Sequence, residues 1–349
     1  MNEFGVYANG TVTGQSSEKS LEFNNYVENG FLEDVFPLVV CAQATTAREG
    51  VELTAKIIDE RGSAEDNMVI IADQKETWYM EIYGGHEYCA LKAPEDCVTA
   101  TGNEFLIETI DETNPDVICS PNLFKLPAEK GFAAYDSNGK MNLYNTYAGP
   151  DTERDTCRLR TWRAHSILSP STSAPYDLHT KMPLFYKPDK KVSLNDIMDI
   201  YRDRYEGTPF SIDTNGKGTY RPINTETSQS IHLTQIYKDL PANMCLLNWS
   251  TWSNSEFNTW VPFSNLESSF DQAYTYMTPN YYNLDENNAF SAFKKLNAIS
   301  AQNRPNVKAG ISDFWHFYEH YIAKISGEAL RSAANSGNSQ EAINAFCKT

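Results

Sequence analysis

One stretch near the start of the chain repeats its apolar residues at helical spacing. Thr46 and Glu49 have the spacing of an N-terminal capping pair, and Gly62 is typical of a helix end. The pattern predicts a helix between Thr46 and Arg61. Its apolar face consists of Ala47, Val51, Thr54, Ala55 and Ile58.

Short runs rich in β-forming residues follow this helix and are separated by turn residues. Gly84-Gly85 lies between two such runs, which is typical of a tight hairpin turn. The order and spacing of the runs predict an antiparallel meander. Its strands are expected over 68–72, 77–83, 86–92 and 97–101.

The second half of the chain repeats this alternation of helices and strands. Ser193 has the position of an N-cap before a helix with an apolar stripe over 193–205, and Gly207 ends it. Further strands are expected over 230–237, 244–249 and 259–263. Helices are expected over 286–302 and 306–348, with a break near 336–338.

Runs of strands alternate with runs of helices along the whole sequence, and no linker or internal repeat separates them. Such an order favours an antiparallel α+β domain over a parallel one. The sequence therefore predicts a single domain over residues 1–349, with a C-terminal helical region at about 286–349.

The charge balance narrows the classes of partner. The chain has 46 acidic and 29 basic side chains and a formal net charge of −17. Because binding to a phosphate backbone needs clustered Lys and Arg, nucleic acid is not expected as a partner. The longest apolar run, 36–42, is far shorter than the roughly 20 residues of a membrane-spanning helix. With no secretory signal at its start, the sequence predicts a cytoplasmic protein that binds no membrane, and it leaves a homo-oligomer open.

The cysteines form no metal or disulfide signature. They are odd in number and scattered, without a Cys-x-x-Cys pair. We expect reduced thiols, most of them small buried hydrophobic residues. The seven are Cys41, Cys89, Cys97, Cys119, Cys157, Cys245 and Cys347.

A spacing of residues that is typical of metal ligands occurs near the C-terminal end. His316, Glu319 and His320 follow the His-x-x-Glu-His order of some zinc peptidases, with both histidines one helical turn apart. A third ligand from a distant element is not evident, and the stretch has the amphipathic pattern of an outer packing helix. A zinc peptidase is therefore a less favoured alternative to a helix with partly exposed histidines.

Two further clusters have both a structural and a functional interpretation. An aromatic cluster could line a cleft, with Trp252 as a substrate contact, or could form core and rim. A basic patch could hold a carboxylate through an arginine, or could join surface ion pairs. The aromatic cluster is Trp249, Trp252, Phe257, Trp260 and Phe263, and the basic patch is Arg154, Arg158, Arg160 and Arg163.

Seven short motifs, none diagnostic alone, are specific for one protein family when they occur together in their order along the chain. Asn2-Glu3-Phe4-Gly5-Val6 is the first, and Gly102-Asn103-Glu104-Phe105 and Arg160-Thr161-Trp162 lie further along. The remaining stretches are 46–53, 71–73, 78–82 and 230–235. In this combination the chain resembles the PepD-type cysteine dipeptidases. These are N-terminal-nucleophile (Ntn) hydrolases related to penicillin and bile-salt acylases.

The resemblance implies a fold and a reaction. The fold is a four-layer αββα sandwich, in which helices cover two antiparallel sheets. The reaction is the hydrolysis of dipeptides without a cofactor. An N-terminal Cys attacks the peptide carbonyl, and its own α-amine serves as the general base. Small peptides are the implied partners.

The resemblance also implies roles for residues that match the motifs. Asn103 is implied to donate to the oxyanion, although a turn-capping Asn would suit this position as well. Arg160 is implied to orient the nucleophile and the substrate, with Arg158 as the alternate. Thr11 or Thr13 lies where the family approaches the scissile carbonyl from the other side.

The chain departs from the family at its start. Family members carry the nucleophilic Cys and a block of sheet and loop ahead of the Asn-Glu-x-Gly-Val motif, whereas Met1 directly precedes the motif here. Removal of Met1 would expose Asn2, which is no nucleophile. We therefore expect an Ntn-hydrolase domain shortened at its N-terminal end, without its first strands and its nucleophile. The alternatives are a separately supplied N-terminal piece, a fragment, and a non-catalytic peptide-binding paralogue.

Overall fold

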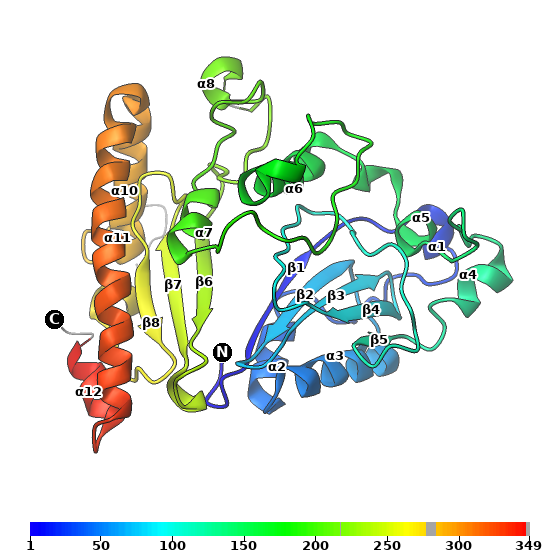
Figure 1. Cartoon of the computed structure of the whole chain (residues 1–349), viewed down its shortest axis with the longest axis horizontal. Coiled ribbons are helices and arrows are strands. Elements are labelled where there is room, and N and C mark those ends of the chain that lie inside the picture. The colour runs from blue at the N-terminus through cyan, green and yellow to red at the C-terminus, as the bar shows by residue number, and fades with distance from the viewer. Residues whose placement is uncertain (217, 277–283, 347–349) are drawn as a thin grey trace. The chain divides into compact units, whose positions relative to one another are not determined.

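A computed structural model describes residues 1–216, 218–276 and 284–346 of the chain. They fall into two units, Met1–Lys191 and Val192–Thr349, and each unit is taken by itself (Figure 1). The expectation of a single domain over 1–349 stays a prediction.

The first unit contains a five-stranded antiparallel sheet whose strands lie in chain order. The expected meander is confirmed for its three central strands, and Gly84 in the hairpin turn has a φ of 70°. The pattern does not predict the first strand, because Asn9 and Gly10 interrupt its β-forming residues. The strands are β1 (Tyr7–Val12), β2 (Asn67–Ala72), β3 (Thr77–Tyr83), β4 (Glu87–Lys92) and β5 (Val117–Cys119).

Alternating side chains of β3 contribute to two separate clusters of the core. Its even-numbered residues pack in a cluster with α2 (Phe36–Gln43) and α3 (Ala47–Arg61). These two helices run along one face of the sheet in Figure 1. Tyr79 and Tyr83 belong to the other cluster, which includes Phe105 and α5 (Leu143–Tyr147). The sheet is therefore buried on both faces.

The helix expected between Thr46 and Arg61 is confirmed as α3. The Thr46 hydroxyl accepts a 3.1 Å hydrogen bond from the backbone N–H of Glu49, and Gly62 follows the helix with a φ of 72°. The Glu49 carboxylate accepts from the backbone N–H of Thr45 at 2.9 Å, one residue before the N-cap. Apolar periodicity and both end signals were sufficient to place this helix.

The strand expected over 97–101 is wrong. Val98 makes only an isolated antiparallel bridge to Tyr186, while β5 occupies the sheet position beside β4. The other helical elements of this unit are α1 (Glu18–Leu21), α4 (Lys125–Lys130), η1 (Pro150–Thr152), α6 (Asp155–Leu168) and η2 (Pro170–Thr172).

The second unit contains a three-stranded antiparallel sheet in the order β6-β7-β8. The strands β6 (Ser230–Ile236), β7 (Leu246–Trp252) and β8 (Val261–Ser264) confirm the three that were expected. The core of this unit also takes in side chains of the C-terminal helices, including Leu330 and Ile343. In Figure 1 the long helix α11 stands beside this sheet.

The helices of the second unit largely follow the predictions. Helices α10 (Ala289–Gln302), α11 (Arg304–Ala334) and α12 (Ser339–Phe346) confirm the helical C-terminal region and its break, and residues 347 and 348 lie outside the described part. The helix expected over 193–205 is shorter, because α7 (Leu194–Ile200) ends before Tyr205, whose φ is 66°. The remaining elements are α8 (Ile212–Asn215), η3 (Ala242–Met244) and α9 (Gln272–Thr275).

These units confirm the α+β class with antiparallel sheets. Each unit combines one antiparallel sheet with helices that share its core. No helix in the described ranges is long and apolar enough to cross a membrane.

Candidate functional site

Asn103 and Arg160, both predicted as site residues, are in direct contact. Nη2 of Arg160 donates a 2.6 Å hydrogen bond to Oδ1 of Asn103. Nδ2 of Asn103 donates a 2.6 Å bond to the backbone carbonyl of Val12, at the end of β1. Nε of Arg160 donates to the carbonyl of Thr156 at 2.7 Å, one turn earlier in α6. The side-chain amide of Asn103 thus links its own loop to α6 and to the end of β1.

A buried acid–base pair lies next to this contact. Glu104 and Arg158 are both buried, and Nε of Arg158 lies 3.2 Å from Oε2 of Glu104. The Thr161 hydroxyl donates to the same carboxylate and accepts a 2.8 Å bond from the backbone N–H of Gly102. Burial raises the pKa of Glu104, although Thr161 and Arg158 oppose the rise. We call Asn103, Glu104, Arg160 and Thr161 the Asn103 cluster.

Gly102 allows α6 to approach the loop closely. A Cβ at this position would collide with the backbone carbonyl of Cys157 in α6. The φ of Gly102 is not positive, so the requirement for glycine here is one of space. This contact explains why the Gly102-Asn103-Glu104-Phe105 motif begins with glycine.

The remaining candidates of the first unit differ in their placement. Thr13 is fully buried, and its hydroxyl donates to the carbonyl of Glu104 at 3.2 Å, so it supports the loop from the β1 side. The Thr11 hydroxyl donates to the neighbouring carbonyl of Val12, at 3.4 Å. Arg158 is buried in its pairs with Glu104 and Glu153. The roles of these residues stay predictions.

Trp252 lies in the second unit and is described apart from the Asn103 cluster. Its ring contacts those of Phe263, Tyr274 and Phe293, with centroid separations of 5.9, 5.1 and 5.3 Å. In the same aromatic cluster, Trp249, Phe257 and Trp260 are buried. For these three the core interpretation holds, while Trp252 is partly exposed and its substrate contact stays a prediction.

The residues of α11 that have the spacing of a zinc site contact other protein groups. Glu319 is fully buried, and its carboxylate pairs with both terminal nitrogens of Arg202. Nε2 of His316 lies 2.7 Å from Oδ1 of Asp199, and Nδ1 of His320 lies 2.8 Å from the carbonyl of His316. Across the described ranges, no three His, Cys, Asp or Glu residues are grouped to hold a metal ion. The geometry therefore gives Glu319 a structural partner in place of a metal.

The six described cysteines are free thiols, and three of them, Cys89, Cys157 and Cys245, are buried. None of the six is in a disulfide, and Cys347 lies outside the described residues. Burial raises the pKa of the Cys89 thiol well above its usual range and also raises that of Cys119. A raised pKa opposes formation of the nucleophilic thiolate.

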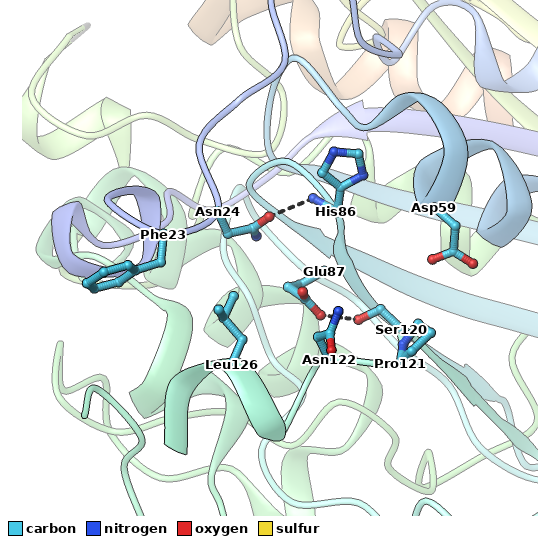
Figure 2. A pocket seen from close by; sticks show the side chains of 9 residues that line it. All are labelled: Phe23, Asn24, Asp59, His86, Glu87, Ser120, Pro121, Asn122 and Leu126. Atoms are coloured by element: carbon cyan, nitrogen blue, oxygen red, sulfur yellow. Dashed lines mark hydrogen bonds between the residues drawn. The ribbon is translucent and has the colours of Figure 1, made fainter. Parts of the chain in front are cut away.

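A pocket of about 570 Å³ lies beside the β3–β4 hairpin in the first unit. Figure 2 shows Oδ1 of Asn24 accepting from the backbone N–H of His86, and Ser120 donating to Glu87. The pocket is separate from the Asn103 cluster, because no residue of that cluster lines it. The lining residues are Phe23, Asn24, Asp59, His86, Glu87, Ser120, Pro121, Asn122 and Leu126.

Comparison with known proteins identifies the family. A sequence profile of peptidase family C69 matches residues 1–316. The chain belongs to peptidase family C69. This membership confirms, at the level of the family, the resemblance to dipeptidases.

The curated relatives of this C69 chain are longer than the chain itself. The probable dipeptidase B of Streptococcus pyogenes serotype M1 is 30% identical over 295 residues, which cover 80% of this chain and 58% of that protein. The probable dipeptidase of Latilactobacillus sakei is 29% identical, with 78% and 59% covered, and that of Salmonella dublin 26% identical, with 75% and 61% covered. The C69 chain thus spans a little over half the length of these relatives.

Two members of the Asn103 cluster in this C69 chain, Glu104 and Thr161, were not predicted as site residues. Glu104 and Thr161 stand directly beside Asn103 and Arg160 in the motifs, and this adjacency was the available signal. Glu81 bonds to the backbone just beyond Asn103, at Leu106. Glu81 lies in the 78–82 motif stretch, but nothing in that stretch connects it with Asn103, because the two residues are far apart in sequence and meet through the fold.

Proposed function

We propose that this chain forms part of a cysteine dipeptidase of the N-terminal-nucleophile type, with the Asn103 cluster beside the reacting carbonyl. The bond between Arg160 and Asn103 carries the proposal, in a member of a peptidase family whose relatives are named probable dipeptidases. Nδ2 of Asn103 has two N–H groups. The carbonyl of Val12 takes one of them, which leaves the other to donate to a substrate oxygen.

The proposed reaction proceeds through an acyl-enzyme. The thiol sulfur adds to the peptide carbonyl while its proton passes to the α-amine of the same Cys. Asn103 donates to the oxyanion that forms, and the amine product leaves with the proton. Water then hydrolyses the thioester, which releases the acid product and restores the thiol. The positive charge of Arg160 beside Asn103 favours the oxyanion or a substrate carboxylate.

The nucleophile is proposed to lie in a segment ahead of the Asn-Glu-x-Gly-Val motif, as the resemblance implies. The raised pKa values of Cys89, Cys97 and Cys119 make these three thiols poor candidates for the nucleophile, because they resist ionisation. The segment would supply the Cys and its α-amine, and this chain would supply the oxyanion donor and the arginine.

The test is an assay of amino-acid release from a panel of dipeptides. The purified chain is assayed alone and after mixing with the segment of a relative that precedes the motif. Turnover by the mixture, abolished when the Cys of that segment is replaced by Ala, supports the whole proposal. Turnover by the chain alone supports a dipeptidase but overturns the external nucleophile. Dipeptide binding without turnover in either sample favours the non-catalytic peptide-binding paralogue.

A further inference from the structure

Glu81 is a fully buried carboxylate in the middle of β3. Its register partners are Met68 on β2 and Cys89 on β4. It lies between Tyr79 and Tyr83 in the strand, whose rings belong to the core cluster on the face opposite α3. A carboxylate in such a place is unfavourable unless hydrogen bonds compensate for the lost water.

Each oxygen of Glu81 accepts one hydroxyl and one backbone N–H. Oε1 accepts from the Tyr79 hydroxyl at 2.8 Å and from the backbone N–H of Leu106 at 2.6 Å. Oε2 accepts from the Tyr83 hydroxyl at 2.8 Å and from the backbone N–H of Ile107 at 3.3 Å. The carboxylate therefore joins β3 to a segment that makes no ladder with the sheet at these residues.

That segment is the one that carries Asn103. Leu106 is three residues beyond Asn103, a separation of at most about 11 Å of chain. Between them, Phe105 packs edge-on against Tyr83, with ring centroids 4.8 Å apart, and the carbonyl of Glu104 accepts from Thr13 at 3.2 Å. A movement of the 106–107 backbone away from β3 would therefore be passed on to Asn103.

We propose that Glu81 is a positioning residue for Asn103: its carboxylate fixes the backbone of Leu106 and Ile107 to β3, and so sets where the Asn103 amide points. The effect on turnover rests on the proposed function, because it assumes that Asn103 contacts the oxyanion. The effect on the position of the Asn103 side chain does not rest on the proposed function. Nothing in the chemistry of Glu81 requires it to touch the substrate.

The charge state of Glu81 is set by its neighbours. In the described residues no Lys, Arg or His forms an ion pair with it, and the titratable groups around it are Tyr79, Tyr83, Cys89 and Glu104. Burial raises the pKa of Glu81 to about 7, against the opposing effect of its hydrogen bonds. An experiment at pH 8 therefore examines mainly the ionised form, which accepts at both oxygens.

Glu81→Gln is the informative substitution, since it keeps the size of the side chain. One of its two terminal atoms becomes an NH₂ group, which cannot accept a hydrogen bond. A tyrosine hydroxyl can turn and accept from this group, but a backbone N–H cannot. The variant must therefore lose the bond to either Leu106 or Ile107.

Glu87→Gln is the matched control. Glu87 is also a buried glutamate with a pKa raised by burial, and it lies on the neighbouring strand. Its carboxylate accepts from the Ser120 hydroxyl, on the β5 side of β4, whereas that of Glu81 accepts from the backbone of Leu106 and Ile107. Any loss that comes only from removing a buried charge should appear in both variants.

The experiment measures kcat and KM in the sample that hydrolyses dipeptides, and the side-chain amide resonances of Asn103, assigned through their absence in Asn103→Ala. For Glu81→Gln we expect kcat to fall roughly 10- to 100-fold with KM within about twofold, and the Asn103 resonances to shift. Glu87→Gln should change neither. Tyr79→Phe, which removes one donor to Oε1, should give a smaller shift in the same direction.

Each result decides the inference. Unmoved Asn103 resonances in Glu81→Gln and Tyr79→Phe overturn it, whatever the activity. Equal effects in Glu81→Gln and Glu87→Gln overturn it too, because the loss would then be general. If the wild-type protein has no turnover, the proposed function fails, but a shift of the Asn103 resonances confined to the Glu81 and Tyr79 variants still supports the positioning role.

Discussion

The guanidinium of Arg160 fixes the orientation of the Asn103 amide across 57 residues of sequence. A guanidinium only donates hydrogen bonds, so the amide oxygen must face Arg160 and the NH₂ group must face the carbonyl of Val12. The amide therefore cannot flip without losing both bonds. This arrangement presents an N–H donor at the end of β1.

Asn103→Ala should lower turnover while leaving the fold intact. The substitution removes the proposed oxyanion donor, and loss of one such donor typically reduces kcat by roughly 10² to 10³. We expect this loss in the sample that hydrolyses dipeptides, with an unchanged circular dichroism spectrum. The exposed Asn138, in the 136–139 turn, offers the control variant Asn138→Ala. Equal kcat in the two variants would assign Asn103 a structural role only.

Gly102→Ala should disturb the same site through the backbone. The added Cβ meets the Cys157 carbonyl, so the loop or α6 must shift, at a cost of about 1–3 kcal/mol in the free energy of unfolding. The measurement is urea unfolding combined with the dipeptide assay. Gly310→Ala is the control, since a Cβ there meets no atom within 4 Å. In the interior of α11 it should stabilise the protein by about 0.4–1 kcal/mol. A neutral Gly102→Ala would show that the loop accommodates the methyl group.

Sequence signals that act over a few neighbouring residues correctly predicted a helix start, a hairpin turn and a break between helices. The N-cap at Thr46, the hairpin glycines at 84–85 and the break at 336–338 all act within one or two turns of chain. The strand expected over 97–101 was wrong for a reason that is not local: Val98 pairs with Tyr186, which lies far away in sequence. The choice of β5 as the neighbour of β4 was equally invisible in the sequence pattern.

The site residues also fall into two groups, those that sequence motifs predicted and those whose partners only the fold brings together. Motif order pointed to Asn103 and Arg160, which the fold brings into contact. Nothing in the local pattern showed that Glu319 would face Arg202, or that Glu81 would bond to the 106–107 backbone. Such partners come together only through tertiary packing, which spacing and periodicity do not encode.

Glu319→Gln should destabilise the second unit. Its carboxylate is the buried counter-charge of Arg202, which also donates to the carbonyls of Ser255 and Asn258. Removing one partner of a buried ion pair typically costs about 3–5 kcal/mol. Glu328→Gln, on the exposed side of the same helix and 4.0 Å from Lys324, should change the free energy of unfolding by less than about 0.5 kcal/mol. Urea unfolding of both variants measures the difference. Similar small effects would contradict a stabilising role for this pair.

The raised pKa of Glu81 predicts that its contribution to stability falls as pH rises. In the folded chain its pKa is about 7, whereas an unfolded glutamate titrates near about 4.3. Between these values the folded protein holds a proton that the unfolded chain has released. The contribution is therefore complete below about pH 4.3 and is lost as pH rises through about 7, with a slope of at most about 1.4 kcal/mol per pH unit.

Comparison of the wild type with Glu81→Gln isolates this titration, because Gln has no proton to lose. The difference in free energy of unfolding should shrink steadily from pH 4.5 to pH 7.5 and stay constant above that range. The same linkage applies to Glu87, whose pKa is also raised by burial, so the comparison of wild type with Glu87→Gln should show a decrease of the same sign. A difference between wild type and Glu81→Gln that grows with pH would mean that the four hydrogen bonds outweigh burial and hold the Glu81 pKa below its usual value.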